Sequence, residues 1–265
     1  MFNFFSRKYK HIVQLIDDVR FIKEFICHKY IGERIVHNVN INGEILYFED
    51  SILSMAVKSI AREMNCGNEY DFSKIDFKEG DIVIDIGANV GIISIYLAKK
   101  YPFLKIYSFE PVKENFDSFQ KNIVLNGIPE NVITAVNCAV TKDARNVVMN
   151  INPYNSGGCS TQEVFATEYN YNTSNINVTS VTLENIFEKY SIKNLKLLKI
   201  DCEGSEYEIL NNTPEQILHK IEYLRGEFHE NKALTSEYDV DVLYDYCCKH
   251  IKNVSVVKAR KCFVV

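Results

Sequence analysis

The sequence predicts an α/β protein with a Rossmann-like, doubly wound and mostly parallel sheet that carries helices on both faces. Two observations predict this fold. From residue 78 onward, short β-branched runs alternate with helical segments, which is typical of a parallel sheet. The first run, Ile82–Ile86, leads directly into a glycine-containing turn, where such folds bind ligands. A chain of 265 residues can bury a core of this kind without disulfides.

Residues 1–77 are predicted to form an N-terminal extension in front of the α/β domain at 78–265. An amphipathic helix is expected over 11–31, a hairpin over 35–48 around Asn42-Gly43, and a second helix over 51–64. The apolar face of the first helix suits contact with a second copy of the chain. A homodimer through this helix is therefore one expectation.

The elements of the α/β domain follow in order. Strands are expected at 82–86, 105–109, 132–136, 195–200 and 221–227, with one or two closing strands within 254–265. Helices are expected at 92–100, 114–126, 183–190, 206–211 and 236–250. Residues 146–182 are rich in Asn, Ser and Thr and are predicted to be irregular. Loops of this length in compact domains are usually functional or disordered.

Composition argues against several classes of protein. The net charge of −5 argues against a protein that binds the phosphate backbone of nucleic acids. The eight cysteines contain no C-x-x-C pair, so a finger-type metal site is not expected. We expect reduced thiols in a cytoplasmic protein. The sequence shows no transmembrane stretch and no signal-peptide pattern.

Ionisable side chains follow four of the predicted strands, at the edge where open α/β sheets bind ligands. In chain order these side chains are Asp85, Glu110, Asp201 with Glu203, and Glu227 with His229. Charged residues are rarely buried in a core without partners. We therefore expect a functional site at this edge of the sheet.

The turn after the first strand distinguishes between cofactors. It reads Asp85-Ile86-Gly87-Ala88-Asn89-Val90-Gly91, or D-x-G-x-x-x-G, whereas a dinucleotide-binding turn reads G-x-G-x-x-G. The observed form resembles the first motif of class I S-adenosylmethionine methyltransferases, whose glycines let the backbone approach the cofactor. Glu110 lies 25 residues after Asp85 and suits hydrogen bonds from ribose hydroxyls.

Taken together, the motifs resemble the FkbM family of methyltransferases over about residues 78–265. They are the glycine turn, Phe109-Glu110-Pro111, Asn122–Gly127, the run from Lys199 to Glu206, and Glu227-Phe228-His229. The resemblance implies methyl transfer from S-adenosylmethionine, usually to a hydroxyl of a sugar, a polysaccharide precursor or another metabolite. It also implies that the cofactor is bound by Asp85, Gly87, Ala88, Asn89, Gly91, Glu110 and Asp201, with Cys138 and Ala139 beside its adenine.

Four residues are the catalytic candidates. The unperturbed pKa of histidine lies near neutral pH, so His229 is expected to be the general base, oriented by Glu227 or Glu230. Asp201 and Glu203 are expected to position the acceptor or the amino group of the cofactor. In an alternative that the sequence does not favour, Asp201, Glu227 and His229 bind a divalent cation that lowers the pKa of the acceptor hydroxyl.

Other functions stay open at this point. A nucleic-acid or protein methyltransferase is one alternative, although the basic cluster near the C-terminus is typical of an ordinary solvated surface. An NAD-dependent sugar-modifying enzyme is another, and it would need the G-x-G-x-x-G turn that is absent here. We expect a small-molecule or carbohydrate acceptor and no nucleic acid. The sequence does not identify the acceptor.

Overall fold

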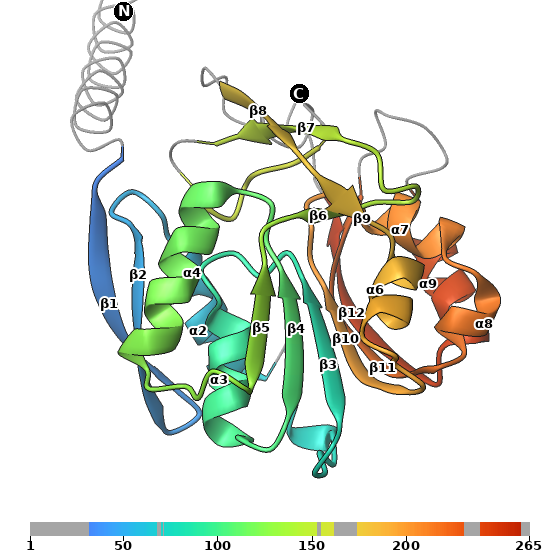
Figure 1. Cartoon of the computed structure of the whole chain (residues 1–265), viewed down its shortest axis with the longest axis horizontal. Helices are drawn as coiled ribbons and strands as arrows, with labels where there is room; N and C mark the ends of the chain where they lie inside the picture. The colour runs from blue at the N-terminus through green and yellow to red at the C-terminus, as the bar shows by residue number, and fades with distance from the viewer. Residues whose placement is uncertain are drawn as a thin grey trace, which may run out of the picture.

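A six-stranded, all-parallel sheet forms the centre of the computed structural model, which describes residues 32–67, 70, 72–152, 155–161, 174–230 and 239–260 (Figure 1). The strand order is β12-β11-β10-β3-β4-β5. The strands are β3 (Ile82–Ile86), β4 (Lys105–Phe109), β5 (Ile133–Val136), β10 (Leu195–Ile200), β11 (Ile221–Glu230) and β12 (Asn253–Arg260). The Rossmann-like fold is confirmed. The direction of strand order reverses between β3 and β10, so the ligand-binding switch point lies there.

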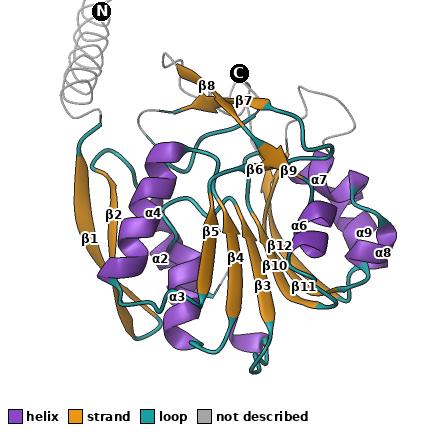
Figure 2. Cartoon of the chain, viewed as in Figure 1, coloured by secondary structure: helices purple, strands orange, loops and turns teal. Residues whose placement is uncertain are grey.

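Helices cover both faces of this sheet (Figure 2). One face carries α2 (Ala56–Cys66), α3 (Ile92–Lys100) and α4 (Lys113–Leu125), and the other carries α6 (Leu183–Lys189), α7 (Glu206–Asn212), α8 (Glu215–Leu218) and α9 (Val240–His250). A short 3-10 helix, η1, spans Phe72–Lys74. Each face has its own apolar cluster, and neighbouring residues of one strand serve both: Val83 packs in the first cluster and Ile84 in the second. This explains why the central strands read as continuous apolar runs.

The N-terminal hairpin is confirmed. Strands β1 (Arg34–Ile41) and β2 (Glu44–Ser51) pair antiparallel around Asn42 and Gly43, whose φ angles are 49° and 93°, as a two-residue hairpin turn requires. The predicted second helix starts later than expected, at Ala56. The predicted helix over 11–31, and with it the expected homodimer, lies outside the described residues.

Asparagine side chains of α4 fasten this hairpin to the α/β domain. Asn122 accepts a hydrogen bond from the Glu49 amide at 2.7 Å and donates to the Glu49 carbonyl at 3.1 Å. Asn126 pairs with the backbone of Tyr47 in the same way. The apolar side chains of the hairpin and of α2 belong to the first core cluster. The N-terminal segment therefore shares a core with the sheet, and the division of the chain at residue 77 stays a prediction.

The expectation that residues 146–182 are irregular is confirmed for residues 155–159, which form turns and loop, and is wrong for the strands on either side. Strand β7 (Val147–Ile151) pairs antiparallel with β8 (Ser174–Val178), and β6 (Ala139–Val140) pairs with β9 (Ser180–Val181). The ribbon β7–β8 lies beyond the carboxyl ends of the central strands (Figure 1). Strand β8 is short and largely exposed, and only Ile176 and Val178 alternate with its asparagines, which is too short an apolar pattern to mark a strand.

Strand β11 is longer than predicted and ends at Glu230 instead of Glu227. Its pairing with β10 stops at Gly226, where a Cβ atom would lie 1.7 Å from the Ile200 carbonyl oxygen. Pairing with β12 continues to the end of the strand. His229 is therefore an internal strand residue and not part of a loop. Among the described residues, no helix is long and apolar enough to cross a membrane.

Candidate active site

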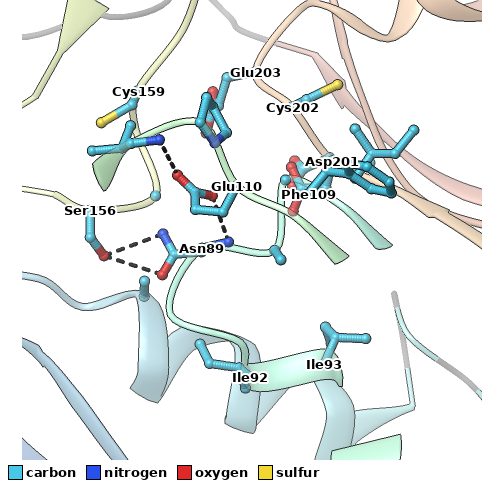
Figure 3. A pocket seen from close by; sticks show the side chains of 18 of the residues that line it. Asn89, Ile92, Ile93, Phe109, Glu110, Ser156, Cys159, Asp201, Cys202 and Glu203 are labelled. Carbon is cyan, nitrogen blue, oxygen red and sulfur yellow. Dashed lines mark hydrogen bonds between the residues drawn. The ribbon is translucent and has the colours of Figure 1, made fainter. Parts of the chain in front are cut away.

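A cavity of about 230 Å³ opens at the carboxyl ends of the central strands, next to the switch point (Figure 3). The loops after β3, β4, β5 and β10 line it, together with β11, residues 155–159 and the helix α2. Of the residues predicted to form the site, those that line the cavity are Gly87, Ala88, Asn89, Glu110, Cys138, Ala139, Asp201, Glu203 and Glu227. The sequence therefore located most of the lining. Asp85, Gly91 and His229 lie behind it.

The two glycines of the turn serve protein packing. Gly87 has φ 76°, and a Cβ atom on it would lie 1.9 Å from the carbonyl oxygen of Asp201. Gly91 has φ 89°, and its Cβ would lie 2.0 Å from the ring of Phe119. Both positions combine a left-handed backbone with a close neighbour, so only glycine fits. The motif suggested that these glycines make room for a cofactor. In the structure, Asp201 and Phe119 fill the space that their Cβ atoms would occupy.

Glu110 is buried and faces the cavity from the end of β4. Its carboxylate accepts hydrogen bonds from the backbone amides of Asn89 at 2.8 Å and Val112 at 2.9 Å, and its contact with the Asn115 amide group is 3.5 Å. Burial raises the pKa of Glu110 to about 7, against the lowering effect of these hydrogen bonds. The side chain is therefore a fixed acceptor whose charge depends on pH near neutrality.

Asp85 is completely buried below the glycine turn. It accepts a hydrogen bond from the Ser94 hydroxyl at 2.6 Å and pairs with the Lys199 ammonium at 3.1 Å. Lys199 also donates to the carbonyl of Gly87 at 2.8 Å. Burial alone would lower the pKa of Lys199, but the Asp85 and Asp201 carboxylates outweigh it and raise that pKa. This ion pair, which sequence reasoning missed, fixes the turn from below.

The second group of site residues surrounds the turn after β10. Asp201, Glu203 and Glu227 all line the cavity. The hydroxyl of Tyr70 donates to Asp201 Oδ2 at 2.7 Å. Glu203 has φ 51°, a left-handed conformation that is uncommon for a residue with a side chain. The turn therefore directs a carboxylate to the cavity at some cost in backbone strain.

His229 lies behind these carboxylates and is almost fully buried. Its Nδ1 atom is 3.1 Å from Glu206 Oε1, while its Nε2 atom is 3.5 Å from Glu203 and 3.9 Å from Glu227. Glu227 and His229 lie on one side of β11, as strand alternation predicts. Burial alone would lower the pKa of His229, but Glu206 and Glu203 outweigh it and raise that pKa well above the ordinary value.

Glu206 orients the ring, where sequence reasoning offered Glu227 or Glu230. It is fully buried, and it also accepts hydrogen bonds from the backbone amides of Cys202 at 2.8 Å and Gly204 at 2.9 Å. It belongs to the run from Lys199 to Glu206 that was singled out as a motif, so the signal was present. Only the fold of the turn shows which atom it contacts.

Glu227 has a pKa raised to about 7, chiefly by burial and then by the nearby Asp201 carboxylate. One ligand atom from each of Asp201, Glu227 and His229 lies within 4.8 Å of the others, so these three residues could hold a metal ion. Among the described residues, this is the one group with such an arrangement.

The N-terminal segment supplies one wall of the cavity, with residues that the sequence did not identify as site residues. Its lining residues are Met55, Ala56, Ser59, Ile60, Glu63 and Tyr70. Opposite the turn, the hydroxyl of Ser156 contacts the Asn89 side chain at 3.4 Å (Figure 3). The same hydroxyl contacts Ser54 at 2.9 Å, and the Ser156 carbonyl accepts from Asn115 at 3.0 Å. The loop at 155–159 thus joins the glycine turn to the N-terminal segment across the cavity.

Comparison with known families agrees with this geometry. Residues 85–246 match the family model described as the methyltransferase FkbM domain, which is more than half of the chain. The chain belongs to the FkbM methyltransferase family. The matched region spans the strands and turns that carry Asp85, Glu110, Asp201, Glu227 and His229.

Three curated proteins are similar to this family member. "Methyltransferase 1" of Beauveria bassiana is 22% identical over 75% of this chain and 84% of its own length. "Methyltransferase sdnD" of Sordaria araneosa is 26% identical over 63% of this chain and 72% of its own length. The "31-O-demethyl-FK506 methyltransferase FkbM" of Streptomyces tacrolimicus is 23% identical over 59% of this chain and 68% of its own length.

Solved structures resemble only part of the chain. TYW2 of M. jannaschii, in complex with AdoMet, is 19% identical over 40% of this chain and 44% of its own, with a TM-score of 0.28. TYW2 of P. horikoshii, in complex with MeSAdo, is 20% identical over 41% of this chain and 38% of its own, with a TM-score of 0.27. The chain therefore spans less than half the length of either structure.

Proposed function

We propose that this chain is an S-adenosylmethionine-dependent methyltransferase that modifies an oxygen of a small polar or carbohydrate acceptor. The observation that carries the proposal is the presence of carboxylates at two separate places in one cavity. Glu110 beside the glycine turn suits a ribose, and the carboxylates Asp201, Glu203 and Glu227 suit a hydroxyl-bearing acceptor. Membership of the FkbM family supports methyl transfer as the reaction.

The cofactor end is built from three neighbouring strand ends. Glu110 is fixed by two backbone amides and faces the cavity, so the ribose hydroxyls can donate to it. Cys138 and Ala139 line the same cavity and suit contact with adenine. The backbone of Gly87, which also lines the cavity, suits the amino-acid end of the cofactor. When bound, S-adenosylmethionine supplies a methyl group activated by its sulfonium sulfur.

The acceptor end must align a hydroxyl and remove its proton. The acceptor oxygen forms a bond to the methyl carbon as the carbon–sulfur bond breaks, and the electron pair of that bond stays on sulfur. The hydroxyl proton passes to the carboxylate pair Glu203 and Glu227, both of which line the cavity. A positioned general base contributes about 10²–10⁴-fold to the rate.

His229 is assigned a positioning role in place of the expected role of general base. Both ring nitrogens face carboxylates, which raise the pKa of the ring and favour its doubly protonated form. A protonated imidazole cannot accept a proton. The ring instead balances the charge of Glu203 and Glu206 and fixes their orientation.

One relative supports oxygen as the methylated atom. The Streptomyces tacrolimicus protein is named as acting on a 31-O-demethyl compound, and it matches 59% of this chain. The carboxylates of the acceptor end fit the same chemistry, since they accept hydrogen bonds from hydroxyls.

Transfer of a ¹³C-labelled methyl group tests the proposal. The protein is incubated with labelled S-adenosylmethionine in three separate reactions, which contain a metabolite extract, a protein extract or RNA. The products of each reaction are examined by NMR. We expect label in an O-methyl group of the small-molecule fraction, and no label there with the variant Glu203→Gln/Glu227→Gln. Label confined to protein or RNA would contradict the proposal and support the macromolecular alternative.

A further inference from the structure

Three side chains at the acceptor end of the cavity have the types and the spacing of a metal site. Asp201 follows β10, while Glu227 and His229 lie two residues apart on β11, and one ligand atom of each lies within 4.8 Å of the others. Ligands on opposite sides of an octahedral magnesium ion are about 4.2 Å apart, because each bond is about 2.1 Å long. The observed spacing accommodates an ion after small side-chain movements.

Groups behind these three residues hold them in position. Glu206 contacts His229 Nδ1 at 3.1 Å and is itself fixed by two backbone amides. The Nε2 side of the ring is therefore directed toward Glu203 at 3.5 Å and Glu227 at 3.9 Å. Metal-binding histidines in proteins are typically held in this way, by a carboxylate at the other ring nitrogen. Tyr70 likewise donates to Oδ2 of Asp201. The arrangement therefore resembles a prepared ligand set more than a chance group of acids.

The local charge also favours a bound cation. Asp201, Glu203, Glu206 and Glu227 surround His229 in a mostly buried region. The nearby ammonium group of Lys199 is already paired with Asp85 and the Gly87 carbonyl. Carboxylates that are removed from water are costly unless a cation compensates them.

We propose that this chain binds one divalent cation of the magnesium or manganese type between Asp201, Glu227 and His229. Carboxylate ligands suit these ions, and one imidazole is compatible with manganese in particular. Binding of the ion displaces the proton from Nε2 of His229, because only an unprotonated ring nitrogen can be a metal ligand. Asp201 and Glu227 line the cavity, so the ion would be reached from the acceptor side. The inference returns to the alternative that the sequence alone did not favour.

The site has a consequence for the acceptor, which rests on the proposed function. Three protein ligands leave open positions on a six-coordinate ion. Two neighbouring oxygens of the acceptor fit these positions, so the acceptor class is a vicinal diol or a hydroxyl beside a carbonyl. The bound hydroxyl becomes more acidic. With Glu227 engaged as a ligand, Glu203 is the carboxylate that receives the proton.

Manganese binding to the chelator-treated, full-length protein tests the site directly. Electron paramagnetic resonance measures free Mn²⁺ during a titration, and we expect one ion bound per chain. The variants Asp201→Asn and Glu227→Gln should weaken binding at least about tenfold, and the positioning variant Glu206→Gln about 10–100-fold. The control Glu188→Gln, which removes an exposed carboxylate on α6, should bind like the wild type. Circular dichroism shows whether each variant is folded.

Two results would overturn the inference. One is a folded wild type that binds neither Mn²⁺ nor Mg²⁺ at millimolar concentration, and the other is an unchanged Mn²⁺ affinity in folded Glu227→Gln. Binding of S-adenosylmethionine is measured separately in the presence of the chelator. Cofactor binding without ion binding rejects the metal site and leaves the proposed function intact. Ion binding without cofactor binding supports the metal site and contradicts the proposed function.

Discussion

The two ends of the cavity are built in different ways. At the proposed cofactor end, the Glu110 carboxylate is fixed by the backbone amides of Asn89 and Val112. At the proposed acceptor end, Glu203 from a turn and Glu227 from a strand both approach the ring of His229 with their side chains. The first end depends on the course of the backbone, and the second depends on the charges that surround one ring. Changes at the two ends should therefore affect different measurements.

Removal of both candidate proton acceptors should have the largest effect. In Glu203→Gln/Glu227→Gln the acceptor proton has no carboxylate to receive it, so kcat should fall by about 10²–10⁴-fold. The affinity for S-adenosylmethionine should change little, because Glu110 is intact. Kinetics and calorimetry measure the two quantities. Equal losses of kcat and cofactor affinity would show that the two ends are not separate.

Gly87→Ala should damage both ends, because Gly87 lies against Asp201. The new Cβ would lie 1.9 Å from the Asp201 carbonyl oxygen at a φ of 76°. Overpacking with left-handed strain should lower the free energy of unfolding by about 2–4 kcal/mol in urea titrations. The matched control is Gly80→Ala, with φ 88° but nothing within 4 Å, which should cost about 1–2 kcal/mol. Equal losses in the two variants would refute the packing argument.

Glu110→Gln tests the cofactor end alone. It exchanges a carboxylate for a neutral amide, and loss of a charged hydrogen bond of about 1.5–3 kcal/mol corresponds to about tenfold or more in the Kd of S-adenosylmethionine. Glu114→Gln removes an exposed carboxylate four residues away and serves as the control. An effect of similar size in the control would point to general electrostatics.

Cofactor affinity should also depend on pH. The pKa of Glu110 is raised to about 7, and its ionised form is the one that accepts from ribose hydroxyls. The affinity is therefore present above that pKa and is lost as the pH falls through it, by up to about tenfold per pH unit. Calorimetry between about pH 6 and 8 measures this dependence. The dependence should be much weaker in Glu110→Gln, and an identical pH profile in that variant would assign it to another group.

Tyr70→Phe should give the smallest change. It removes the hydrogen bond of 2.7 Å to Asp201 and keeps the aromatic ring in the core. Loss of about 1–1.5 kcal/mol would reduce kcat/KM by about five- to tenfold. The Kd for S-adenosylmethionine and the melting temperature report whether the change is confined to the acceptor end. A large fall in melting temperature would indicate a structural role instead.

Most of the cavity lining at the proposed cofactor end could be predicted from the sequence. Strands β3 and β4 have the predicted bounds, and Glu110 follows directly from the end of β4. A short parallel strand is marked by a local pattern, and the position of the residue after it is fixed by the sheet. The packing role of Gly87 was not predictable, because its neighbour Asp201 belongs to a different part of the chain.

The acceptor end could be predicted only in part. The rule of strand ends identified Asp201, Glu203 and Glu227, but it placed His229 at the open cleft, whereas continued pairing with β12 buries it. Contact between Glu206 and His229 depends on a turn whose φ angles are positive at Glu203 and Gly204. Hydrophobic periodicity carries no information about such a turn, or about the long-range packing that brings in Tyr70 and α2.

Calorimetric titration of the wild-type protein with S-adenosylmethionine and, in parallel, with NAD tests the central claim most directly. The absence of a second turn glycine at Asn89 and the fixed carboxylate of Glu110 lead us to expect one S-adenosylmethionine per chain with a micromolar Kd, and no binding of NAD. A folded protein that binds NAD and not S-adenosylmethionine would contradict the account and support an NAD-dependent enzyme.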